Sequence, residues 1–413
     1  MIICSAIKKF LRPLWRKAYQ TYEKKHVQYS TFDVPINKLL RGGENGIRAA
    51  KYAELSGNFM RPSTPIIHGH HIKLLQLFDQ IGEKIFEEGT LKETDYYKNA
   101  LQCIHLTGSY FYDDPEMIQT LARRFINQHI GLKEILPAQP GQSEIGQPIW
   151  VRPIRDSSYY EVIDGNHRIA LAYMKGETSI RARIYDKEPT YTPLQQLLLD
   201  SLWINKKKWL YQPVDSPELN ENWKLVRKSK DRLILMKNFL KNIEGLKSYL
   251  DIGSCYGWFL SQMKKEGFDV FGMDRDPFAV DIGQHVYDLD KSHVMLGDIG
   301  ASLKQCVDEK KSFDIVSCFS VLHHYALGKS SLSAQDFMQL IDKVTGKVLF
   351  FETGQDHESA FEGSLNGWND DSIPKWIQQN STFKKVIFLG KDKDNIPPFE
   401  GYYQRALYAC TRD

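Results

Sequence analysis

The sequence predicts two domains of different class, an α+β domain followed by a doubly wound α/β domain. The chain has 413 residues, which is longer than one hydrophobic core usually organises, so two domains are expected. Beyond residue 246, short apolar runs alternate with segments of helical length, a pattern typical of a parallel sheet with helices on both faces. Before residue 190, strand and helix patterns are mixed without that alternation. We therefore expect an N-terminal α+β domain and a C-terminal α/β domain.

Composition indicates a folded chain that is not specialised for coating nucleic acid. Aromatic residues make up 12% of the chain, which argues against long disordered tracts. The formal net charge of +3 is close to balance, so it gives little support to nucleic acid as a partner. The six cysteines show no CxxC spacing, and neither a zinc site nor a disulfide framework is expected. With no long apolar run and no signal-peptide core, we expect a cytoplasmic location.

The first 30 residues show a basic amphipathic pattern. In "MIICSAIKKFLRPLWRKAYQ", apolar residues recur at helical spacing, while basic residues fall mostly elsewhere on the helical wheel. One interpretation is a helix that rests on anionic lipid, with Trp15 near the interface. Pro13 would kink that helix, and the other interpretation is a terminal helix packed on the protein body. Peripheral contact with the inner face of a membrane is therefore one of two open expectations.

The remaining chain divides into three parts. Residues 31–190 contain the mixed strand and helix patterns, including a helix predicted over 114–130 and strands predicted at "PIWVRPI" and "YYEVIDG". Residues 191–245 begin with a Pro-initiated helix and continue as a polar stretch, so we expect a helical connector. Residues 246–413 carry the regular alternation of the α/β domain.

A strand-to-helix turn in the first domain carries three polar residues in succession. In "YYEVIDGNHRIALAYMKG", the strand ends at Asp164 and Gly165, and a helix then opens with Asn166, His167 and Arg168. The first amides of a helix are unpaired, and a guanidinium suits phosphate oxygens, so the turn predicts a phosphate site. The alternative is a structural turn in which Asp164 caps the helix and His167 is merely exposed.

The stretch from 150 to 186 resembles the ParB and sulfiredoxin-like fold, and within it the nucleotide-dependent branch that includes free-serine kinases. The resemblance implies ATP and Mg²⁺ as cofactors, with Asn166, His167 and Arg168 at the phosphates and Asp164 as base or metal ligand. Sulfiredoxins carry a cysteine where this chain has Asn166, so sulfinic acid reduction is not expected. ParB proteins add a helix-turn-helix, for which the sequence offers no candidate. A kinase is the better remaining interpretation.

A second glycine turn opens the α/β domain. The stretch "LDIGSCYGWFLSQMKKEG" places a strand, then a turn and then a helix, and glycines let such a turn approach a ligand closely. The next two strands end at carboxylates, Asp274 and Asp298, and a carboxylate at the end of the second strand can accept hydrogen bonds from ribose hydroxyls. The fourth strand ends in "FSVLHHY". The residues of the turn itself are Asp251, Gly253, Cys255 and Gly257.

The order of these elements resembles class I S-adenosylmethionine-dependent methyltransferases from about residue 246 to the end. Cys255 departs from the glycine that is frequent there, but a small residue is expected to be tolerated. A nicotinamide dehydrogenase would use a more regular GxGxxG turn than this GxxxG. The residues that the resemblance assigns to S-adenosylmethionine are Asp251 beneath the methionine portion, Gly253, Cys255 and Gly257 around it, Asp274 at the ribose, Asp298 at the adenine amino group, and Phe319 beside the cofactor.

"FSVLHHY" and "KVLFFETGQDHE" resemble the methyltransferase half of bacterial kinase-methyltransferases that cap O-antigen polysaccharides. In those proteins a sugar hydroxyl is phosphorylated and the phosphate is then methylated. The resemblance implies that His323 and His324 lie where the acceptor approaches, either as a pair or with one ring packed and one facing the site. No "PPY"-type tetrapeptide follows the fourth strand, so nucleobases are disfavoured as acceptors.

Three functional hypotheses follow from the sequence. The first is a bifunctional kinase-methyltransferase whose partner is a polysaccharide or lipid-linked glycan. The second is a methyltransferase directed to a nucleic acid by a ParB-like binding domain, which near-neutral charge disfavours. The third is a small-molecule methyltransferase whose first domain is a scaffold. "HGHH", with His68, His70 and His71, has no fourth ligand at recognisable spacing, so a surface or substrate-contact role is expected in place of a metal site. The oligomeric state is left open.

Overall fold

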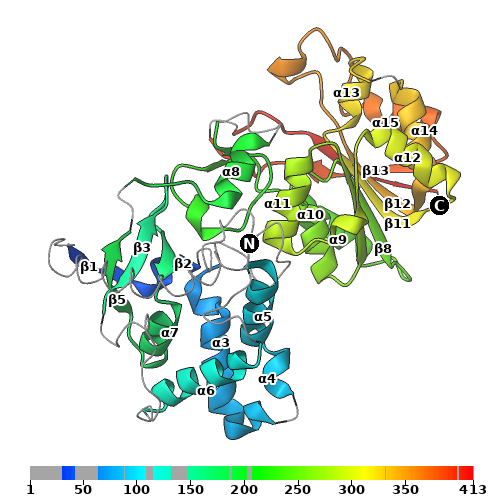
Figure 1. Ribbon diagram of the computed structural model, residues 1–413. Coiled ribbons are helices and arrows are strands. Elements are labelled where there is room, and N and C mark those ends of the chain that lie inside the picture. Colours follow the sequence, from blue (N-terminus) through cyan, green and yellow to red (C-terminus); the bar gives the residue numbers. More distant parts are fainter. Residues whose placement is uncertain are drawn as a thin grey trace, which may run out of the picture. The chain divides into compact units, whose positions relative to one another are not determined.

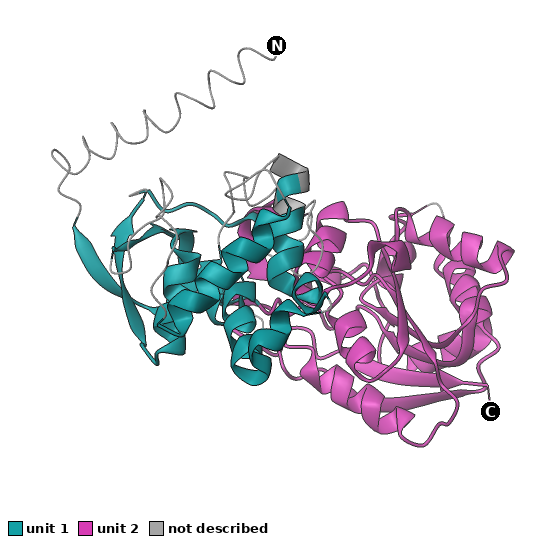
Figure 2. Ribbon diagram, turned by 60° about the horizontal axis from the view of Figure 1, so that its bottom comes forward, with its two compact units in different colours: residues 1–193, 216–221 teal, residues 194–215, 222–413 magenta. Residues whose placement is uncertain are grey.

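The computed structural model comprises two compact units, which are described separately (Figure 2). Unit 1 contains Met1–Pro193 and Ser216–Glu221, and unit 2 contains Leu194–Asp215 and Asn222–Asp413. The predicted amphipathic segment lies outside the described residues. No helix in the described part of the chain is long and apolar enough to span a bilayer. The residues that the structure describes are 30–41, 64–87, 89–107, 115–131, 147–185, 188–201, 207–330, 332–397 and 400–412.

Unit 1 is built on a mixed five-stranded sheet with the order β1-β5-β3-β4-β2. Strand β3 lies at its centre, parallel to β5 and antiparallel to β4. The outer strands differ, since β1 runs antiparallel to β5 and β2 runs parallel to β4. The strands are β1 (Thr31–Pro35), β2 (Leu39–Arg41), β3 (Ile149–Pro153), β4 (Tyr160–Asp164) and β5 (Ser179–Ile184).

Helices complete unit 1 and give it two adjoining cores. One core lies on the sheet and includes Val151, Val162 and Ile169. The other lies among the helices and includes Leu75 and Phe125. The predicted α+β class is therefore confirmed for this unit. Its helices are α3 (His70–Ile81), α4 (Thr90–Glu93), α5 (Asp95–Thr107), α6 (Met117–His129) and α7 (Asn166–Met174).

Unit 2 contains a seven-stranded sheet with the order β10-β9-β8-β11-β12-β14-β13. The first five strands in this order are parallel, as the alternating pattern predicts. Each of the last two strands runs antiparallel to the strand before it in this order, β14 to β12 and β13 to β14. The strands are β8 (Ser248–Ile252), β9 (Asp269–Asp274), β10 (Val294–Leu296), β11 (Phe313–Phe319), β12 (Thr345–Glu352), β13 (Lys385–Lys391) and β14 (Ala406–Thr411).

Helices cover both faces of this sheet (Figure 1). Alternate strand residues point to opposite faces, so Leu250 and Phe351 join the core beneath α12, α14 and α15. Their neighbours Tyr249 and Phe350 join the core beneath α9 and α10. The doubly wound class is confirmed. The helices are α9 (Lys230–Leu240), α10 (Trp258–Lys265), α11 (Pro277–Tyr287), α12 (Ile299–Asp308), α13 (Leu322–Ala326), α14 (Ala334–Val344) and α15 (Ser372–Asn380).

Much of the predicted connector packs on unit 2. After α8 (Pro193–Asp200), strand β6 (Trp209–Leu210) pairs with β7 (Lys224–Leu225). Between these strands, the side chain of Gln212 accepts a hydrogen bond from the Trp258 amide at 3.3 Å. The carbonyl of Pro213 accepts one from the Tyr287 hydroxyl at 2.6 Å. The segment before the first strand of the large sheet is therefore held against the carboxyl ends of its strands.

We expect Phe337→Ala to destabilise unit 2 strongly. Phe337 is fully buried, and its ring stacks on that of Tyr325 with 3.8 Å between centroids. Loss of a buried phenyl group typically lowers the free energy of unfolding by about 3–5 kcal/mol. Phe388→Ala is the matched control, because 54% of that residue is exposed. Urea unfolding that shows equal midpoints for the two variants would contradict the assigned core.

Candidate methyl-transfer site

The turn between β8 and α10 depends on left-handed backbone. Gly253, Cys255 and Gly257 have φ values of 76°, 51° and 76°. A Cβ atom on Gly253 would lie 2.4 Å from Cγ2 of Val321, and one on Gly257 would lie 2.2 Å from Cδ1 of Leu289. Both glycines are therefore required by conformation and by space. Cys255 adopts the same region without being glycine, so its neighbours must stabilise it.

Asp274 supplies that stabilisation from the end of β9. Its Oδ2 accepts a hydrogen bond from the Cys255 amide at 2.6 Å, and its Oδ1 accepts one from the Asp276 amide at 2.9 Å. Burial raises the pKa of this carboxyl group, while the amide hydrogen bonds oppose the rise. A carboxylate offers about four acceptor positions, so two amides leave capacity for ribose hydroxyls. The sequence-predicted role therefore fits the geometry.

Asp251 lies beneath the same turn in a buried polar chain. Ser317 donates to Oδ1 of Asp251 at 2.6 Å, and the Tyr249 hydroxyl lies 2.6 Å from Ser317 Oγ. Oδ2 of Asp251 is buried and has no hydrogen-bond partner within the described residues. Burial is the main cause that raises the pKa of Asp251 to about 7. A buried acceptor of this kind suits a ligand with cationic or N–H groups, as S-adenosylmethionine has.

The other two residues predicted to contact the cofactor are already engaged within the protein. Asp298 is the N-cap of α12, and its Oδ1 accepts from the Ala301 amide at 2.8 Å. Phe319 is 7% exposed and packs on Phe259 with 5.1 Å between ring centroids. Asp298 is thus at the predicted edge of the sheet, whereas Phe319 belongs mainly to the core below it.

The two histidines after β11 have different environments. His323 is buried, and its Nδ1 accepts from the Gly354 amide at 3.2 Å. Burial lowers the pKa of His323 to about 2, so this ring is neutral and structural. His324 is exposed. Its pKa is lowered to about 4, first by partial burial and then by Lys329, Arg275 and Arg405. Only His324 is therefore placed to meet an acceptor.

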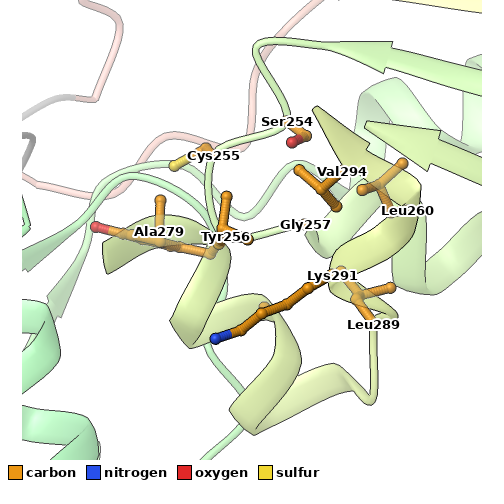
Figure 3. A pocket seen from close by; sticks show the side chains of 11 residues that line it. Ser254, Cys255, Tyr256, Gly257, Leu260, Ala279, Leu289, Lys291 and Val294 are labelled. Carbon is orange, nitrogen blue, oxygen red and sulfur yellow. The ribbon is translucent and has the colours of Figure 1, made fainter. Parts of the chain in front are cut away.

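A small crevice lies beside the glycine turn (Figure 3). Apart from Ser254, Tyr256 and Lys291, its lining is mostly apolar and comes from the turn, from α10 and α11, and from the loop before β10. A Cβ atom on Gly283 of α11 would lie 3.1 Å from the carbonyl oxygen of Tyr256. The crevice therefore marks the close packing of the turn on α11. It is lined by Ser254, Cys255, Tyr256, Gly257, Leu260, Ala279, Val280, Gly283, Leu289, Lys291 and Val294.

In unit 1, the predicted phosphate turn is braced by its own arginine. Gly165 has φ of 117°, and a Cβ atom there would lie 2.5 Å from Cγ2 of Ile149. Arg168 donates to Asp164 Oδ2 at 2.7 Å and to the carbonyls of Gln147 at 2.7 Å and Pro148 at 2.8 Å. The fork of Arg168 thus fixes the turn to the start of β3. Its predicted role at a phosphate stays a prediction.

His167 packs into an aromatic cluster between α7 and the helices beside it. Its Nε2 lies 3.1 Å from the Tyr96 hydroxyl, and its ring centroid lies 4.5 Å from that of His71. Burial lowers the pKa of His71 to about 3. His70 is also buried, so the expected surface position is wrong for these two histidines, whose rings pack among the helices. Asn166 begins α7, and its Oδ1 is buried with no hydrogen-bond partner in the described part of the chain.

The described residues contain no group of three or more His, Cys, Asp or Glu side chains arranged to hold a metal ion. The Asp164 side chain, which the sequence assigns to Mg²⁺, is 60% exposed and paired with Arg168.

A buried charged cluster, which the sequence did not predict, lies beside "FSVLHHY". Nη2 of Arg227 donates to Glu352 at 2.8 Å and to Asp392 at 2.5 Å, and all three side chains are fully buried. Arg405 donates to Glu352 at 3.0 Å and to Glu358 at 2.7 Å. Charged residues are expected on the surface unless they are paired. Because the partners here are far apart in the sequence, no local pattern predicts that these residues are buried together.

Comparison with known proteins identifies the C-terminal unit. Residues 225–377 match a family model described as "Methyltransferase domain", so the chain contains a methyltransferase domain. A comparison with curated proteins finds no match.

Two of the similar solved structures are of WbdD, one of them described as the bifunctional kinase-methyltransferase. Each is 15% identical to this chain, covers 53% of it and has a TM-score of 0.40. The chain spans 47% and 46% of the lengths of these proteins. A third structure is the magnesium protoporphyrin IX methyltransferase ChlM from Synechocystis PCC 6803 with bound SAM. It is 14% identical, covers 45% of this chain and 79% of its own, and has a TM-score of 0.32.

We expect Asp274→Ala to weaken S-adenosylmethionine binding by about 100-fold or more, because hydrogen bonds to charged groups contribute about 1.5–3 kcal/mol each. Asp269→Ala is the control, since Asp269 is exposed at the start of the same strand. Titration calorimetry on the full chain measures both. Unchanged affinity in Asp274→Ala would remove Asp274 from the cofactor site.

We expect the affinity for S-adenosylmethionine to depend on pH through Asp251. A cationic ligand beside Oδ2 favours the ionised carboxylate, so the proton held with a pKa of about 7 is released on binding. Affinity for S-adenosylmethionine should then rise by up to about ten-fold between pH 6 and pH 8. Asp251→Asn removes this titration and any remaining slope belongs to the ligand. Identical slopes in wild type and variant, measured by calorimetry in two buffers, would rule out the proposed linkage.

Proposed function

We propose that this protein is a bifunctional kinase-methyltransferase: unit 1 phosphorylates a terminal sugar hydroxyl of a bacterial surface polysaccharide, and unit 2 methylates that phosphate. The charge around His324 is the observation that supports an anionic methyl acceptor. Three cations act on this ring, and two of them, Lys329 and Arg275, are exposed. The third, Arg405, is buried and paired with carboxylates. An anionic oxygen acceptor matches that environment.

The cofactor side is assigned to residues that the turn brings together. Asp274 would hold the ribose hydroxyls, and Asp251 would lie beneath the methionine portion. Gly253 and Gly257 let the turn pack closely on Val321 and Leu289, because side chains at either position would collide with these residues. S-adenosylmethionine supplies an electrophilic methyl group when bound. The methyl donor would then lie at the carboxyl ends of β8 and β9, where doubly wound folds bind ligands.

The acceptor side needs cations and positioning more than a base. A phosphate monoester dianion is already a nucleophile, so no proton has to leave it before attack. Arg275 and Lys329 are exposed and would hold the dianion near the methyl group. His324, with its pKa of about 4, would remain neutral at pH 7 and serve as a hydrogen-bond partner.

The kinase part of the proposal rests on the turn of unit 1. Backbone amides at the start of α7 would receive phosphate oxygens of ATP. The exposed carboxylate of Asp164 would serve as base or Mg²⁺ ligand, and His167 and Asn166 lie in the first turn of the helix. The resemblance of this stretch to nucleotide-dependent kinases supports the assignment. A lipid-linked glycan at the inner face of the cytoplasmic membrane would be the shared substrate.

One observation favours a second candidate, a methyltransferase with a non-catalytic first unit. Arg168 already donates to Asp164 and to two backbone carbonyls. Both terminal nitrogens of its guanidinium group are therefore engaged within the protein and not with a phosphate. In that case unit 1 would bind the acceptor or act as scaffold, and the phosphate would be added elsewhere.

The test uses the full chain with ATP labelled at the γ-phosphate, S-adenosylmethionine labelled at the methyl group, and a panel of glycans with free or phosphorylated termini. Both labels on a single glycan would support the full proposal. Methyl label on phosphorylated glycans alone would favour the second candidate. Transfer of the methyl label to uncharged acceptors would contradict the proposal that the acceptor is anionic.

Charge reversal at the acceptor side sharpens this test. The double variant Arg275→Glu, Lys329→Glu should raise the KM for the phosphorylated glycan by about ten-fold or more, since each lost charged contact is worth about 1.5–3 kcal/mol. S-adenosylmethionine affinity should stay within about three-fold by calorimetry, a difference below ~1 kcal/mol. Lys265→Glu, exposed at the far end of α10, is the control.

A further inference from the structure

The hydroxyl of Ser320 is surrounded by polar groups from segments far apart in the sequence. The Tyr211 hydroxyl donates to it at 2.6 Å, and guanidinium groups donate from Arg405 at 2.7 Å and Arg227 at 3.1 Å. Ser320 in turn donates to Glu352 Oε1 at 3.0 Å. A hydroxyl has two lone pairs and one proton, so three donors share two lone pairs and no acceptor position on this oxygen is left open.

The groups around Ser320 belong to a balanced buried network. Arg227, Arg232 and Arg405 are paired with carboxylates through hydrogen bonds of 2.5–3.0 Å, and each arginine is at most 3% exposed. Removing such charges from water is costly, and buried ion pairs are weak evidence for stability. A cluster of this size at the carboxyl ends of β11 and β12 therefore calls for another role.

Ser320 occupies a strained position at the start of the acceptor segment. Its φ is +60°, in the left-handed region that non-glycine residues rarely adopt. Its amide donates to the Glu352 carbonyl at 3.1 Å. The next residue, Val321, contacts the turn at Gly253 so closely that no Cβ atom fits there. Two residues further on, α13 presents His323 to the core and His324 to solvent.

We propose that Tyr211, Arg227 and Arg405 are positioning residues that hold Ser320 in this conformation and thereby fix His324 and the acceptor relative to the methyl donor. The inference rests on methyl transfer by unit 2 and is independent of the kinase. It places a positioning residue, Tyr211, before the span 225–377 that matches the methyltransferase family.

Two small changes in the full chain test this. Tyr211→Phe removes one oxygen, and Ser320→Ala removes the hydroxyl on which the donors converge. In each, methyl transfer to the phosphorylated glycan should fall by about ten-fold to 100-fold, because misplacement by about 1 Å is that costly. S-adenosylmethionine affinity should stay within about three-fold by calorimetry, a change of less than ~1 kcal/mol.

A second measurement needs no acceptor and so stands if the proposed acceptor is wrong. NMR titration of ¹³C-labelled histidine follows His324, whose pKa of about 4 should rise toward its ordinary value when the segment loosens. Tyr408→Phe is the control, since its hydroxyl donates to the Asp370 carbonyl at 3.1 Å, outside this network. Wild-type His324 titration together with wild-type turnover in both variants would overturn the proposal. Parallel loss of S-adenosylmethionine binding would also overturn it, by making the network part of the cofactor site.

Discussion

The site in unit 2 depends on one carboxylate that joins two strand ends. Asp274, at the end of β9, accepts hydrogen bonds from the amides of Cys255 and Asp276. The first of these holds the neighbouring turn in a left-handed conformation that cysteine does not favour. The same group that is predicted to bind ribose therefore also shapes the turn that receives the rest of the cofactor. Binding and backbone conformation are coupled through a single side chain.

Two kinds of buried charge meet at this edge of the sheet and have opposite consequences. Asp251 is incompletely satisfied, and its raised pKa makes it responsive to a ligand. Glu352 is paired with Arg227, Arg232 and Arg405, and this pairing lowers its pKa against the effect of burial. The first arrangement leaves an acceptor atom, Oδ2 of Asp251, available to a ligand. In the second, the carboxylate of Glu352 is fully hydrogen-bonded, and such a network is rigid.

The sequence predicted those parts of the site that follow from local rules. Gly253 and Gly257 lie in a tight turn and Asp274 ends the second strand of the domain, and the sequence pattern predicts both positions. Their roles toward the cofactor were implied by the resemblance and stay predictions. The sequence could not predict the contacts of Arg227, because its partners at Glu352 and Asp392 lie more than 120 residues away. It also assigned Arg168 to phosphate, whereas the structure shows backbone carbonyls within reach of the same fork. The antiparallel end of the sheet was not predicted either, because an apolar run carries no signal of its direction.

The division of the chain into units has a consequence for synthesis on the ribosome. Unit 1 includes Ser216–Glu221, which follow a segment belonging to unit 2. Within unit 1, Thr192 donates to the buried carboxylate of Glu218 at 3.2 Å. The nascent N-terminal unit therefore cannot complete its own polar contacts until Leu194–Asp215 has left the exit tunnel, while the sheet on which that segment packs is still unmade. During translation both units are therefore incomplete at the same time. No single cut in the chain would separate the residues of unit 1 from those of unit 2.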